Sequence, residues 1–163
     1  MAKYSNMLET TLLFLHNLLR WVILVTLLYA ITRSWSAMRA KRAFTAGERK
    51  GALIMLISAH LTLVIGLYQW LFGRYGIIST SLPPGTDLMK DKFYRFFWVE
   101  HPCGMVVGIT LITIGYSTIK KGTAKAGLGK KAFWMLLIAL IFLLATIPWQ
   151  GMPVIGRPLV PHV

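Results

Sequence analysis

The sequence predicts an all-α membrane protein, a four-transmembrane-helix up-down bundle, and three observations support this fold class. Hydrophobic residues make up 56% of the chain and charged residues only 14%. The mean hydropathy is +0.61, outside the range of ordinary soluble domains. Four apolar segments each approach or exceed the roughly 20 residues that a helix needs to cross a bilayer. We therefore expect residues 1–163 to form a single integral membrane domain.

Each predicted span follows from an apolar run. The four runs cover residues 8–32, 51–72, 94–119 and 132–149. We expect the first to be retained rather than cleaved as a signal peptide, because no basic leader precedes it and Arg20 lies within it. Tryptophans near the span ends are typical of the aromatic belt at a membrane surface.

The net charge of +13 is concentrated in two connections on one side of such a bundle. Six basic residues separate the first two spans, and five separate the last two: Arg33, Arg39, Lys41, Arg42, Arg49 and Lys50, then Lys120, Lys121, Lys125, Lys130 and Lys131. The positive-inside rule predicts that both connections are cytoplasmic, with both termini outside. Contact with anionic lipid explains this charge better than nucleic-acid binding does.

The two remaining segments are predicted to lie on the outer side. The connection over residues 73–93 contains Pro83, Pro84 and Gly85, a composition typical of turns. The tail over residues 151–163 holds three prolines, so we expect it to run extended along the outer surface. His162 in this tail is expected to be solvated.

Three histidines, His16, His60 and His101, each lie in a different apolar run. Histidine is costly in hydrocarbon without a partner, so three of them predict a shared polar site or a bound cofactor. At about 1.5 Å per residue, all three lie roughly 10 to 18 Å from the outer ends of their spans, with His60 deepest. Away from the span edges, Arg20 and Glu100 are the charged residues within the spans, and we expect Arg20 to pair with Glu100 or with a cofactor carboxylate.

The third span carries further signals beside its histidine. Pro102 removes a backbone donor and predicts a kink or a first helical turn. Gly104 and Gly108 leave a shallow groove on the His101 face, which would accept either another helix or a flat ring.

Our leading interpretation is a membrane electron-transfer protein that binds one b-type heme. Iron accepts imidazole as an axial ligand, and in an up-down bundle the first and third spans are diagonal neighbours. His16 and His101 are at matching depth, so they would reach a porphyrin from opposite sides, although His60 remains an alternative ligand. Arg20, Glu100, Gly104 and Gly108 complete the predicted cofactor site.

Two alternatives stay open at this point. His16, His60 and His101 would form a three-histidine metal site with Glu100 as a fourth ligand or base. The same residues would otherwise form a cofactor-free polar network in an accessory or quinone-contacting subunit of a larger membrane complex. A three-histidine metal site would allow catalysis, but across the three interpretations we expect a redox carrier or subunit rather than a stand-alone enzyme. The expected partners are the lipid bilayer, a quinone or other membrane redox subunits, and copies of this chain or of another in an oligomer.

Several strings resemble a known family. They are Leu15-His16-Asn17-Leu18-Leu19-Arg20-Trp21, Ala59-His60-Leu61 with Gly66-Leu67-Tyr68, Val99-Glu100-His101 with Ile114-Gly115-Tyr116, and Ile147-Pro148-Trp149. Nearly the whole chain is similar to small four-span membrane proteins of Bacteroidetes-type bacteria that are labelled cytochrome b or cytochrome b-like. The resemblance implies the bacterial inner membrane and heme b, and it touches His16, Arg20, His60, Glu100 and His101. The Pro102-Cys103 pair departs from the family pattern.

Overall fold

The computed structural model describes residues 2–159, with side chains from residue 7 onward, and its regular elements are all helical. Four of the helices are long and apolar enough to cross a membrane. This confirms the predicted four-helix bundle. In chain order the elements are α1 (Ala2–Arg39), α2 (Ala46–Phe72), α3 (Lys92–Arg95), the π-helical turn η1 (Phe96–Glu100), α4 (His101–Gly122) and α5 (Gly129–Thr146).

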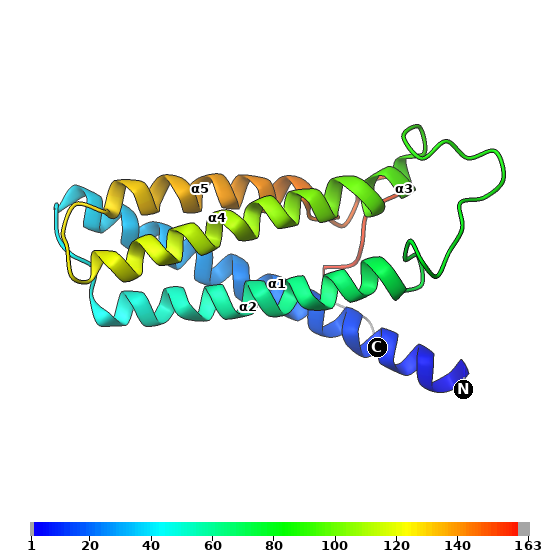
Figure 1. Ribbon diagram of the computed structural model, residues 1–163, viewed down its shortest axis with the longest axis horizontal. Coiled ribbons are helices and arrows are strands. Elements are labelled where there is room, and N and C mark those ends of the chain that lie inside the picture. Colours follow the sequence, from blue (N-terminus) through cyan, green and yellow to red (C-terminus); the bar gives the residue numbers. More distant parts are fainter. Residues whose placement is uncertain (1, 160–163) are drawn as a thin grey trace.

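The four long helices lie side by side, and consecutive helices run in opposite directions (Figure 1). Helix α1 packs mainly on α2 and α5, and α4 packs on the same two helices, so α1 and α4 are diagonal as expected. The long connection over residues 73–91 lies at one end, which we call the outer end, and the two basic connections lie at the other, the inner end. Toward the outer end, the first turns of α1 diverge from α4 and α5 (Figure 1).

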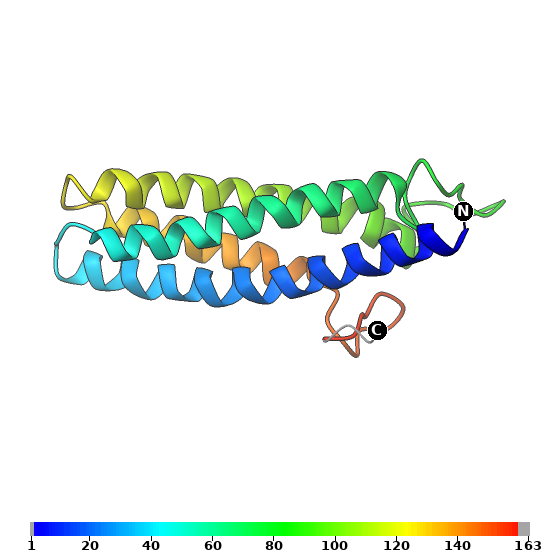
Figure 2. The same cartoon turned by 90° about the horizontal axis from the view of Figure 1, so that it is seen from below.

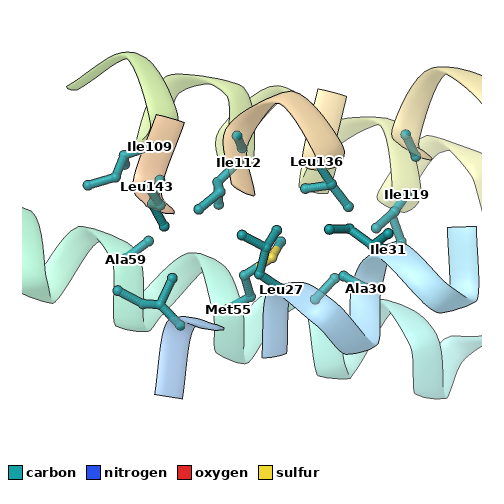
Figure 3. Close-up of a cluster of buried hydrophobic side chains, with 14 of the residues drawn as sticks. Leu27, Ala30, Ile31, Met55, Ala59, Ile109, Ile112, Ile119, Leu136 and Leu143 are labelled. Carbon is teal, nitrogen blue, oxygen red and sulfur yellow. The ribbon is translucent and has the colours of Figure 1, made fainter. Parts of the chain in front are cut away.

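The core lies between the four long helices in the inner part of the bundle. Leu27, Met55, Ile112 and Leu136 are fully buried there, one from each helix (Figure 3). Alanines and glycines occupy many of the helix contacts, as is usual where packing rather than hydrophobicity drives association in a membrane. This tight core leaves the divergent outer half as the place where a ligand would fit.

The helices begin and end at polar features that the apolar runs do not mark. Helix α2 begins five residues before the predicted span, because Thr45 and Glu48 form a reciprocal capping box. The buried Glu48 carboxylate also forms ion pairs with Arg33 and Arg42, each at 2.7 Å. The Arg33 pair connects the inner ends of α1 and α2, and the Arg42 pair holds the connection between them to α2.

Pro102 neither ends nor sharply breaks its helix. The chain passes from α3 through η1 into α4, and the N–H of His101 donates to the carbonyl of Phe96 in the π-helical turn. Pro102 cannot donate to the carbonyl of Trp98, four residues earlier, and this carbonyl instead accepts the indole N–H of Trp70 at 3.1 Å. A side chain from α2 therefore satisfies the acceptor that the proline frees.

The outer connection is turn-rich, as predicted, but the C-terminal tail is not extended. Ile147 has the extended backbone that a following proline favours, and α5 accordingly ends at Thr146 rather than at the predicted residue 149. The tail then turns back, with the N–H of Arg157 donating to the carbonyl of Pro148 at 3.1 Å. Figure 2 shows the tail beside the outer half of α1. His162 lies outside the described residues.

Candidate functional site

A cavity of about 1390 Å³ opens in the outer half of the bundle, where α1 diverges. It is lined by all four long helices, the start of the outer connection and the C-terminal tail. Its volume is above the roughly 300–1,000 Å³ range of typical cofactor and small-molecule sites. The described part of the chain therefore has room for a large ligand beside His16 and His101.

His16 and His101 face each other in this cavity. Their ring centroids are 6.3 Å apart, and the ring planes are inclined by 57°. The two residues come from α1 and α4, the diagonal helices, which otherwise make few contacts with each other. The bundle thus brings together, across its axis, the two histidines that the sequence places at matching depth.

The ring of His101 is fixed by a backbone acceptor. Its Nδ1 lies 2.7 Å from the carbonyl oxygen of Thr146, at the end of α5. Because a carbonyl can only accept, Nδ1 carries the proton, and in the neutral ring Nε2 is then unprotonated and able to bind a metal. This carbonyl orients the ring in the way that second-shell groups orient metal-binding histidines.

The ring of His16 lies against α2 at a glycine. A Cβ atom at Gly66 would be 3.1 Å from the Cε1 atom of His16, so the missing side chain makes room for the imidazole. The Nδ1 atom of His16 is buried and has no hydrogen-bond partner in the described part of the chain. A buried polar atom without a partner is uncommon in proteins, so this nitrogen is a candidate contact for a ligand in the cavity.

Arg20 lines the cavity one helical turn from His16, but it does not pair with Glu100. Its guanidinium donates to the carbonyl of Leu159 at 2.9 Å, and the indole N–H of Trp21 reaches the same carbonyl at 3.0 Å. Glu100 is exposed and forms an ion pair with Arg95 at 2.7 Å. The predicted Arg20–Glu100 pair is therefore wrong, because the tail supplies the acceptor. The Nε atom of Arg20 remains buried and unpartnered.

His60 does not join the other two histidines. It is exposed on α2 and is not among the residues that line the cavity, and its Nδ1 bonds to the carbonyl of Leu56 in its own helix at 2.9 Å. Among the described residues, no group of three or more His, Cys, Asp or Glu side chains is arranged to hold a metal ion. The geometry thus offers a pair of histidines and not the convergent triad of the three-histidine alternative.

Gly104 and Gly108 face α5 rather than the cavity. A Cβ atom at Gly104 would meet Thr146, and one at Gly108 would meet Leu143. Of the two occupants that the sequence allows for this groove, a neighbouring helix is the one present. The close approach also brings the Thr146 carbonyl within reach of His101.

The cavity contains polar residues that the sequence analysis missed. Gln69 has a buried, unpartnered Nε2 atom, and Arg74 and Arg157 line the same space. The sequence could have identified Gln69 as a candidate site residue, since it is a polar residue in an apolar run, three positions after Gly66. The sequence could not have identified Arg157, because the position of this residue depends on how the tail folds.

The chain matches no protein-family model, no curated protein and no solved structure. The resemblance to cytochrome b-like proteins therefore stays a prediction, and the function must be inferred from the geometry of the cavity.

Proposed function

We propose that this chain is a membrane electron-transfer protein that binds one b-type heme between His16 and His101. The observation that carries the proposal is the 6.3 Å separation of the two ring centroids. A metal–imidazole bond is about 2 Å long, and each nitrogen lies about 1 Å from its ring centre, so two imidazoles on opposite sides of one metal have centroids about 6 Å apart. The observed separation of the His16 and His101 rings is close to this value and supports the proposal.

The surrounding residues fit the same group. The Thr146 carbonyl holds His101 with Nε2 free, and the buried Nδ1 of His16 has no partner among the described residues, which leaves this nitrogen available to a ligand. The cavity is lined mostly by apolar side chains, which suits a macrocycle. When bound, heme b supplies a one-electron couple between ferric and ferrous iron.

Electron transfer follows from the residues on both sides of the site. If both His16 and His101 held the heme iron, the group would supply one-electron transfer rather than binding of oxygen or a substrate. The chain would therefore pass electrons rather than transform a substrate, with a quinone or another membrane redox subunit as partner. Neither Glu100 nor His60 lines the cavity, so neither has a role in this proposal.

The decisive measurement is an optical spectrum of the purified protein, first oxidised and then reduced with dithionite. We expect about one heme per chain, and sharp α and β bands after reduction, as for a low-spin bis-histidine site. A colourless protein, expressed with ample heme and free of transition metals by elemental analysis, would contradict the proposal. That result would favour the accessory or quinone-contacting subunit instead.

We further propose that the outer end faces the periplasm of a bacterial inner membrane. A backbone hydrogen bond of 2.9 Å between Phe44 and Gly122 shows that the two inner connections lie at the same end of the bundle. Together they carry eleven basic residues, and the positive-inside rule favours the cytoplasm for such connections. In a Cys103→Ser background, Ser81→Cys should react with a membrane-impermeant maleimide in intact cells, and Ala126→Cys should not. Both positions are exposed in the structure. The opposite labelling pattern would reverse the assigned orientation.

A further inference from the structure

Two arginines line the cavity and have no acidic partner in the described part of the chain. Arg74 follows the outer end of α2, and Arg157 belongs to the C-terminal tail. Arg157 makes one weak hydrogen bond, to the carbonyl of its neighbour Gly156 at 3.4 Å, and the side chain of Arg74 makes none. Most of their N–H donors are therefore available to a ligand.

Both guanidinium groups lie over the same group of aromatic rings. Arg74 lies 5.6 Å from the ring centre of Tyr75, and Arg157 lies 4.7 Å from that of Phe97 and 5.5 Å from that of Phe93. Phe93 contacts both of the other rings, at 5.1 Å from Tyr75 and 4.9 Å from Phe97. Stacking on an aromatic face leaves the edge of a guanidinium open, and that edge matches the two oxygens of a carboxylate.

The net positive charge of the cavity lining indicates that the ligand is negatively charged. Arg20, Arg74 and Arg157 line the cavity against a single acid, Glu9, which leaves an excess of two positive charges. The Glu9 carboxylate is itself engaged with the backbone N–H of Arg74. The unpartnered amide nitrogen of Gln69 adds a further donor to the same cavity. A ligand with two carboxylates would balance the charge and accept these hydrogen bonds.

We propose that Arg74 and Arg157 bind the two carboxylate side chains of the heme, so that the C-terminal tail docks onto the bound cofactor. This inference rests on the proposed heme site. It gives the tail a role, because the tail is held to α1 through Arg20 and would be held to the cofactor through Arg157. The two arginines act as positioning residues and leave the axial ligands unchanged.

The test compares hemin with its dimethyl ester, in which both carboxylates are blocked. The apoprotein in detergent is titrated with each compound, and binding is followed by the Soret band. We expect the wild-type protein to prefer hemin by about hundredfold relative to the ester, since each charge-assisted interaction contributes about tenfold. In the double variant Arg74→Gln/Arg157→Gln this preference should fall to about threefold or less. Arg157→Lys should lie between the two.

The affinity for the ester serves as the internal control for folding. It should be the same in the wild-type and double-variant proteins, and Arg49→Gln, at the exposed inner end of α2, should leave both affinities unchanged. A double variant that keeps the wild-type preference, or loses the ester as strongly as hemin, would overturn the inference and leave the heme site standing. A wild-type protein with no Soret band for either compound would overturn the proposed function, and this inference with it.

Discussion

Replacing His101 or His16 with alanine should abolish the low-spin spectrum of the reduced protein. Each ring supplies one of two axial ligands in the proposed site, and they face each other at 6.3 Å with no third histidine lining the cavity. Heme content should fall by at least about tenfold, because even weaker outer-shell changes at metal sites cost tenfold to hundredfold. Heme per chain and the reduced α band measure both effects.

His60→Ala is the matched control, since it removes a histidine at a similar depth that lies outside the cavity. It should keep both the heme content and the α band. His101→Gly distinguishes a lost ligand from a lost fold, because added imidazole should enter the vacated space and restore the sharp spectrum. A His60→Ala protein that loses the bands, or a His101→Ala protein that keeps them, would contradict the assignment of ligands.

The bundle itself could be predicted because a membrane span has a simple signature. Four apolar runs of sufficient length are enough to give four helices, and consecutive membrane crossings run in opposite directions. The helix ends were less predictable, since helices continue past the hydrocarbon. The inner end of α2 is set by Thr45 and Glu48, whose capping box is polar and so falls outside an apolar run.

The histidine pair was predictable only in part. Counting residues from the span ends gives depth, and this put His16 and His101 at one level. Counting does not give the direction in which a side chain points, which depends on how each helix is rotated about its axis. Helix α2 turns Ala52, Met55 and Ala59 inward, so His60, about 100° further round the helix, is exposed.

The outer part of the cavity depends on contacts between distant segments. Arg157 enters the cavity because the tail turns at Gly151 and Val154, both with positive φ, and folds back toward α1. The prolines of the tail suggested an extended path instead. Arg20 found its acceptor at Leu159 rather than at Glu100 for the same reason. Sequence spacing alone carries no information about either contact.

Two backbones approach closely at the inner end at Gly129, the first residue of α5. A Cβ atom there would lie 2.5 Å from the backbone nitrogen of Met38 and 2.8 Å from its Cα atom, on α1. Gly47, in the first turn of α2, is a matched control. Its nearest neighbour to an added Cβ is the hydroxyl oxygen of Thr45 at 3.9 Å.

Gly129→Ala should therefore lower the thermal unfolding midpoint in detergent by about 5 °C or more, whereas Gly47→Ala should leave it unchanged or raise it slightly. A backbone cannot rotate aside as a side chain can, so α1 and α5 must move apart and lose packing around Ala37 and Ala132, both of which are buried. Alanine at position 47 meets no such obstacle and favours the helix by about 0.5–1 kcal/mol. Equal midpoints for the two variants would show that α1 and α5 do not approach this closely. Because position 129 is at the opposite end from the cavity, the folded fraction of Gly129→Ala should keep the heme spectrum of the wild-type protein.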